Sequence, residues 1–279
     1  MSVDVAEAAP PSKPKREVFY RHTLVVRLTH WINAICFVLL MGSGLQIFNA
    51  YPRLHWGQFG ANADTAFLEV GATMPAGEPQ GFVAIAGVEF NTNGVLGYSN
   101  GEFRGFPAWA TIPSWRDLTA GRSWHFFFAW VLVIKGAIYL IAGALNRHFQ
   151  RDLKPTRAEL RLSHILKDLW DHMRLRYPKG EAAKRYNILQ KLAYLSVIFG
   201  LFPLVILTGL TMSPGFNAIA PILLDIFGGR QSARTLHFIA ASGLVLFVLV
   251  HLSQVVLAGF WNELRSMITG RYEIKPETP

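Results

Sequence analysis

The sequence predicts an all-α membrane protein, a four-transmembrane-helix bundle with a long extracytoplasmic insert between its first and second helices. Of the 279 residues, 51% are hydrophobic and only 16% are charged, which is too apolar for an ordinary soluble domain. Four apolar stretches each have about the 20 residues that a helix needs to cross a bilayer. A long polar stretch rich in Gly, Asn and Pro separates the first of them from the second.

The N-terminal half is expected to hold the first two transmembrane helices. Residues 1–20 are small, Pro-rich and charged, without the apolar core of a cleavable signal peptide, so we interpret them as a disordered cytoplasmic arm. The first transmembrane helix is assigned to residues 21–50 and the second to residues 123–145. Lys135 lies too deep in the second helix to reach water easily, and we expect it to face the interior of the bundle.

Residues 51–122 differ in composition from the rest of the chain. They contain the turn sequence Asn93-Gly94, which predicts a hairpin, and they end in a stretch rich in Trp and Pro. An ordered loop of this length is uncommon and is usually functional. We interpret these residues as a cap outside the membrane, with an amphipathic end that lies at the interface.

The C-terminal half is expected to hold the other two transmembrane helices and a basic loop before them. This loop includes an amphipathic run, RAELRLSHILKDLWDHM, which predicts a surface helix. The assigned ranges are 146–191 for the cytoplasmic loop, 192–212 for the third helix, 213–233 for a short outer loop, 234–260 for the fourth helix and 261–279 for a cytoplasmic tail.

Positively charged residues predict the orientation of the bundle. Residues 1–30, 146–191 and 259–279 together hold twenty of the 27 Lys and Arg, whereas the two opposite loops and their edges hold six. Because such residues concentrate on the cytoplasmic side, we expect both termini in the cytoplasm and the insert outside. The net charge of +9 is thereby explained without nucleic-acid binding.

Four histidines lie near the ends of the predicted transmembrane helices. His237 and His251 are fourteen positions apart, just under four turns, so their rings face nearly the same side of one helix, about 21 Å apart along its axis. His30 shares the cytoplasmic depth of His251, and His125 the outer depth of His237. Haem iron suits such pairs, and the single cysteine, Cys36, excludes covalent attachment. The pattern predicts two non-covalent haem b groups between the helices, which we favour over isolated structural histidines.

Three arginines each precede one of these histidines by three residues, on the same helix face. Arg27, Arg122 and Arg234 are therefore candidates to bind the anionic propionates of haem, with ordinary interfacial arginine as the alternative. Gly44 lies on the first helix at the depth of the outer histidines. A residue without a side chain there would let a flat porphyrin approach the backbone, although glycine also serves close helix packing.

Four local motifs mark the predicted helices in order. They are RxxHW at the first, GRSWHF at the second, RYNILQKLAYL leading into the third and H-x13-H in the fourth. In order and spacing they resemble the membrane cytochrome b subunits of formate dehydrogenase, hydrogenase and thiosulfate reductase complexes. The resemblance implies two b-type haems that link the quinone pool to a catalytic subunit, paired as His30 with His251 and His125 with His237. It also implies a quinone site beside the cytoplasmic haem, to which Asn187 contributes.

The insert is much longer than in formate dehydrogenase and resembles variants that serve molybdopterin oxidoreductases. We therefore predict a cytochrome b that transfers electrons between quinone and an extracytoplasmic redox subunit, a molybdopterin enzyme, docked on the insert. Two alternatives stay open: a stand-alone b561-like quinone oxidoreductase that uses a small oxidant such as superoxide, and a haem-free transporter or sensor with structural histidines. A large ordered cap favours a protein partner over a small oxidant. An absorption spectrum of the reduced protein distinguishes a haem protein from the haem-free alternative.

Overall fold

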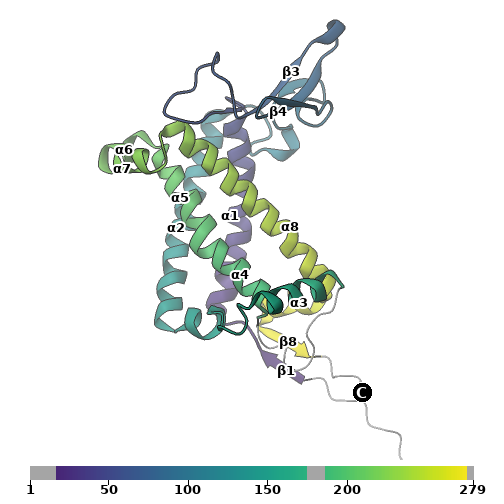
Figure 1. The fold of residues 1–279 in the computed structure, drawn as a ribbon, viewed down its shortest axis with the longest axis vertical. Coiled ribbons are helices and arrows are strands. Elements are labelled where there is room, and N and C mark those ends of the chain that lie inside the picture. The colour runs from purple at the N-terminus through teal and green to yellow at the C-terminus, as the bar shows by residue number, and fades with distance from the viewer. Residues whose placement is uncertain (1–16, 175–185, 275–279) are drawn as a thin grey trace, which may run out of the picture.

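The computed structural model describes residues 17–174 and 186–274, and long helices form its framework (Figure 1). Within these residues four helices are long and apolar enough to cross a membrane, as predicted. They are α1 (Leu24–Phe48), α2 (Leu118–Leu145), the continuous run of α4 (Ile188–Ser196), the π-helical turn η5 (Val197–Leu201) and α5 (Phe202–Thr211), and α8 (Arg230–Thr269).

Side-chain caps decide where three of these helices begin. The oxygens of Thr23, Asp117 and Asn187 each accept a hydrogen bond from a backbone N–H in the first turn of the helix that follows. Such a cap satisfies donors that would otherwise be unpaired, so a helix can begin before its apolar stretch. The second transmembrane helix therefore begins at Leu118 and not at residue 123, and the third at Ile188 and not at residue 192.

The last transmembrane helix ends in a kink. Gly259 has φ 122° and ψ 81°, a conformation that L side chains rarely adopt, one residue before the predicted end of the span. A further helical segment reaches Thr269, and β8 (Arg271–Ile274) then pairs antiparallel with β1 (Glu17–Tyr20). This corrects two expectations, because part of the predicted tail is helix and strand, and residues 17–20 are an ordered strand. Residues 1–16 of the predicted arm lie outside the described residues.

The insert is built from β-strands, so the all-α prediction holds only for the membrane bundle. A four-stranded antiparallel sheet has the order β2-β3-β4-β5, and β6 and β7 form a separate hairpin. The strands are β2 (Arg53–Leu54), β3 (Leu68–Thr73), β4 (Gln80–Ile85), β5 (Val88–Asn91), β6 (Gly97–Ser99) and β7 (Glu102–Arg104), with short 3-10 turns η1 (Pro75–Gly77) and η2 (Ala108–Ala110).

The tight hairpin of the insert does not lie where the sequence predicted it. Ala86 and Gly87 connect β4 to β5, and both have positive φ, as two-residue hairpin turns require. Asn93 and Gly94 lie instead in the turn between β5 and β6, where Gly94 N–H donates to the carbonyl of Tyr98. The Asn-Gly pair therefore marks a turn, but not a two-residue hairpin.

Figure 1 shows how the remaining elements cover the two ends of the bundle. The insert, α6 (Pro214–Ile219) and α7 (Ile222–Ile226) lie at one end, which we call the insert end. The strands β1 and β8 and the helix α3 (Leu162–Met173), which forms most of the predicted amphipathic run, lie at the other end, which we call the terminal end. A short π-helical turn, η3 (Phe149–Leu153), follows α2.

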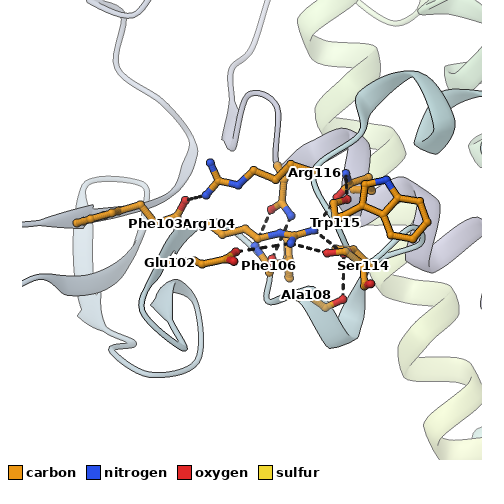
Figure 2. A network of polar contacts seen from close by, with 11 residues as sticks. Glu102, Phe103, Arg104, Phe106, Ala108, Ser114, Trp115 and Arg116 are labelled. Atoms are coloured by element: carbon orange, nitrogen blue, oxygen red, sulfur yellow. Dashed lines mark hydrogen bonds and ion pairs between the residues drawn. The ribbon is translucent and has the colours of Figure 1, made fainter.

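A buried arginine ties the last strand of the insert to the bundle. Arg104 is only 5% exposed, and its guanidinium donates to the Ser114 carbonyl, the Thr111 hydroxyl and the Gln46 side-chain oxygen, each at 2.7 Å (Figure 2). Gln46 lies on α1 and in turn donates to the carbonyl of Trp115. Burial lowers the pKa of Arg104 from its ordinary value. These bonds fix β7 and the approach to α2 against the end of α1.

The first residues of the insert are tied to α8. Arg234 donates to the carbonyls of Tyr51 and Arg53, and the Thr235 hydroxyl donates to the carbonyl of His55. The apolar core beneath this contact contains Phe48 of α1, Leu54 and Val70, with Phe238 of α8 packed against it. The insert is thus held by both α1 and α8, and its contacts with α8 lie at Arg234 and Thr235, within three residues of His237.

Candidate functional site

Two pairs of imidazole rings face each other between helices. The ring centres of His30 on α1 and His251 on α8 are 6.2 Å apart, and those of His125 on α2 and His237 on α8 are also 6.2 Å apart. The angles between the ring planes are 59° and 60°. The first pair lies toward the terminal end and the second toward the insert end, and we call them the inner pair and the outer pair.

The spacing within each pair fits one metal ion held from both sides. A metal–imidazole bond of about 2 Å on each side, with about 1.1 Å from nitrogen to ring centre, requires centres about 6 Å apart. Two imidazoles in van der Waals contact could also lie at this distance, but two equal spacings at two levels are what two bis-imidazole sites require.

Hydrogen bonds fix which nitrogen of each outer histidine is free. His125 Nδ1 lies 3.2 Å from the Leu40 carbonyl and 3.2 Å from Ser43 Oγ. A carbonyl only accepts, so Nδ1 must carry the proton and Nε2 must be unprotonated in the neutral ring. His237 repeats this arrangement, because its Nδ1 lies 3.2 Å from Thr208 Oγ1, and the Thr208 hydroxyl donates its own proton to the Leu204 carbonyl and can only accept from the ring. In both rings Nε2 is therefore the nitrogen available to a metal.

The inner pair has different surroundings. His30 Nδ1 is buried and has no hydrogen-bond partner within the described part of the chain. The Trp31 ring meets the His30 ring edge-on at 5.3 Å, and Phe247 stacks on His251 with centres 5.9 Å apart. Aromatic rings hold the inner imidazoles where hydroxyls and carbonyls hold the outer ones.

Comparison with known proteins supplies the family. A family model described as prokaryotic cytochrome b561 matches residues 21–270, which is nearly the whole chain. The chain belongs to this family. It is also similar to YedZ1 of Azospira oryzae, named as a candidate protein-methionine-sulfoxide reductase subunit, with 26% identity over 242 residues that cover 87% of this chain and 93% of the relative. No solved structure matches.

Members of the cytochrome b561 family bind haem b, and the residues present fit that group. One pair of neutral imidazoles is a donor set that would hold one haem iron, so two pairs would suit two such groups. Two glycines complete the outer site, because a Cβ added to Gly44 would lie 3.3 Å from His125 Cε1, and one added to Gly209 would lie 3.3 Å from His237 Cε1. Each outer imidazole thus packs against a helix backbone that has no side chain at that point.

The three arginines are placed differently from one another in this b561 chain. The Arg234 guanidinium is engaged by two carbonyls of the insert and lies over the rings of Phe48 and Tyr51. Arg27 donates to the carbonyl of Ile268, and Arg122 is exposed above the ring of Phe126. Arg234 therefore has a structural role that the sequence did not indicate, and binding of propionates by these residues stays a prediction.

Asn187 lies at the start of α4 and has two roles at once. Its side-chain oxygen accepts from Gln190 N–H at 2.8 Å, and Gln190 Oε1 accepts from the backbone N–H of Asn187, which completes a capping box. Its amide nitrogen lies 3.2 Å from His172 Nε2 on α3. Capping, the alternative to quinone binding, is thus present, while the amide group also reaches a histidine of the surface helix.

Lys135 faces the interior of the bundle, as predicted. Its ammonium donates to the side-chain oxygen of Asn33 on α1 and lies 6.0 Å from the ring centre of Phe202. Only 9% of Lys135 is exposed. The sequence did not single out Asn33, because one asparagine in an apolar stretch carries no periodic signal.

Proposed function

We propose that this b561 chain is a di-haem cytochrome b that transfers electrons between the quinone pool and an extracytoplasmic redox partner. The observation that carries the proposal is the presence of two histidine pairs, each with ring centres 6.2 Å apart, toward opposite ends of one bundle. Two stacked bis-imidazole sites are a route for electrons across a membrane. The chain is an electron-transfer subunit with no substrate chemistry beyond the quinone step.

His30 and His251 hold the inner haem and His125 and His237 the outer one. When bound, each haem supplies reversible one-electron chemistry between ferric and ferrous iron. The protein's part is to present Nε2, exclude water with the surrounding apolar side chains and keep both imidazoles neutral. The Nδ1 contacts of the outer pair with Leu40, Ser43 and Thr208 support this assignment.

The quinone site lies at the terminal end, beside the inner haem and near Asn187. The resemblance to cytochrome b subunits of dehydrogenase complexes assigns this position to quinone binding, and two contacts support it. The amide of Asn187 can hydrogen-bond a quinone carbonyl. His172, 3.2 Å from that amide and hydrogen-bonded to the Asp168 carbonyl through Nδ1, is a group that can accept or deliver the protons of quinone chemistry.

The partner docks on the insert, on the outer face of a bacterial inner membrane. The name of the Azospira oryzae relative describes a subunit of a reductase of protein methionine sulfoxide, which favours a multi-subunit oxidoreductase over a stand-alone enzyme that uses a small oxidant. We propose that the partner is a molybdopterin oxidoreductase. The insert, fixed to α1 through Arg104 and to α8 through Arg234, would support it beside the outer pair.

Single histidine variants test this function. His30→Ala and His251→Ala should each lose one haem, the same one, and His125→Ala and His237→Ala should each lose the other, as seen in reduced-minus-oxidised spectra of the purified protein. His55→Ala is the matched control, since His55 is buried in the insert and bonds to Tyr51. Two haems in all four variants, or the same haem lost from variants of different pairs, would refute the assignment.

A further inference from the structure

One arrangement occurs twice around the outer pair, on helices far apart in the sequence. On α1, Ser43 and Gly44 meet His125, and on α5, Thr208 and Gly209 meet His237. The distances are the same in the two copies. The hydroxyl oxygen lies 3.2 Å from the histidine Nδ1, and a Cβ added to the glycine would lie 3.3 Å from the histidine Cε1 and 3.6 Å from its Nδ1. Such agreement indicates one geometric solution for holding an imidazole against a neighbouring helix.

The hydroxyl in each copy is oriented by its own helix. Ser43 Oγ donates to the Leu39 carbonyl at 2.5 Å, and Thr208 Oγ1 donates to the Leu204 carbonyl at 2.6 Å. A hydroxyl has one proton, so once that proton is committed to a carbonyl the oxygen can only accept. Each hydroxyl therefore accepts from the imidazole Nδ1–H, and His125 Nδ1–H also lies 3.2 Å from the Leu40 carbonyl.

We infer that Ser43 and Thr208 are positioning residues that hold the two outer imidazoles with Nε2 directed at iron and lower the reduction potential of the outer haem. A hydrogen bond from the distal ring nitrogen raises the basicity of a ligating histidine. A more basic ligand stabilises ferric iron more than ferrous iron. The inner site lacks this device at His30, whose Nδ1 has no hydrogen-bond partner in the described residues, so the effect distinguishes the two haems.

The inference rests on the proposed function, because it requires haem at the outer pair. It concerns residues that do not touch iron and whose loss need not empty the site, since the Leu40 carbonyl persists beside His125 in any side-chain variant. We therefore expect a change in the properties of the outer haem more than a change in its presence.

A redox titration of purified protein, followed by visible absorption, tests the inference. Thr208→Val removes the hydroxyl at nearly constant volume, and Ser43→Ala removes the other. Each should shift the midpoint of one haem, the one missing from His125→Ala, to a higher potential, and the double variant should shift it further. Thr208→Ser keeps the hydroxyl and should restore the wild-type midpoint.

Thr211→Val is the matched control. Thr211 is also fully buried on α5 and also donates to the carbonyl four residues earlier, Leu207, but within the described residues its hydroxyl has no hydrogen bond to a histidine. It should leave both midpoints unchanged. Selective loss of the outer haem from Thr208→Val, with both haems kept in Thr208→Ser and Thr211→Val, would also support positioning.

Two results would overturn the inference. One is a pair of unchanged midpoints in the double variant with two haems bound, and the other is an equal shift in Thr211→Val. If Thr208→Val fails to fold, Ser43→Ala decides alone, because it acts on the other ligand from another helix. Absence of haem from the wild-type protein would instead refute the proposed function, so the two failures are distinguishable.

Discussion

Substitutions at Gly44 test how closely the outer imidazoles pack on their neighbouring helices, where Gly209 makes the equivalent contact. A Cβ at Gly44 would lie 3.3 Å from His125 Cε1, tighter than the 3.4–4 Å of ordinary contact, so the ring must give by a few tenths of an ångström. Overpacking of this kind costs about 1–3 kcal/mol, and replacing a helical glycine by alanine returns about 1 kcal/mol. Gly44→Ala should therefore change the free energy of unfolding by between about 0 and 2 kcal/mol, toward lower stability, and keep both haems.

A larger side chain should have a qualitatively different effect. The added carbons of Gly44→Leu would occupy the position of the His125 ring, so we expect displacement of that ligand and loss of the outer haem. Haem content by pyridine haemochrome and thermal unfolding of the purified protein measure both effects. Gly136 on α2 is the matched control, because an added Cβ there meets nothing within 4 Å, and Gly136→Leu should keep two haems. A Gly44→Leu protein with two haems and the wild-type spectrum would refute the packing argument.

Three further predictions follow from other parts of the molecule. Asn187→Ala should lower the rate of haem reduction by quinol, because both the helix cap and the amide are lost. Asn187→Asp keeps the cap and should lower this rate equally, with two haems still bound. Wild-type kinetics in the Asp variant would leave capping as the role of Asn187. The double variant Val88→Glu, Phe90→Glu changes the exposed strand β5. It should weaken electron transfer with the partner and leave haem reduction by quinol unchanged, and Glu89→Gln is the control. Undiminished transfer would exclude β5 as part of the docking surface. Burial, reinforced by the charge of Arg21, lowers the pKa of His22 to about 4, below the unfolded value of about 6.5. The unfolded state therefore takes up the proton first, and stability falls as pH decreases through this window. Between about pH 7.5 and pH 5 the wild type should lose about 2 kcal/mol that His22→Gln keeps, measured by thermal unfolding, and equal losses would contradict this.

The membrane bundle was predictable because hydropathy and the spacing of histidines are carried by many residues at once. Four apolar stretches predicted the transmembrane helices. Histidines on different helices at the same membrane depth were predicted to face each other, as the rings of His30 and His251 do. That these rings ligate haem stays a prediction. Helix starts were less predictable, because Asp117 and Asn187 act as caps through single hydrogen bonds outside the apolar stretches.

The insert and the surroundings of the histidines depend on long-range contacts that leave no local pattern. Asn93-Gly94 was a poor guide to the hairpin because Ala86-Gly87 supplies the required backbone conformation, with alanine in an unfavoured positive φ. The spacing of Arg234 to His237 predicts a propionate ligand, which stays a prediction, but it does not indicate that the guanidinium donates to carbonyls 181 and 183 positions earlier in the chain. Ser43 and Thr208 are single small residues in apolar helices, and only the fold brings them to the imidazoles.

The number of haems bound per chain tests the central claim most directly. Pyridine haemochrome analysis of the purified full chain, referred to protein concentration from amino-acid analysis, should give two haem b per chain, with both reduced by a quinol analogue and both six-coordinate in the visible spectrum. Two bis-imidazole pairs with the same 6.2 Å spacing leave no reason for one to bind haem and the other not. A stoichiometry of one, or none, in protein from cells supplied with haem would contradict the account.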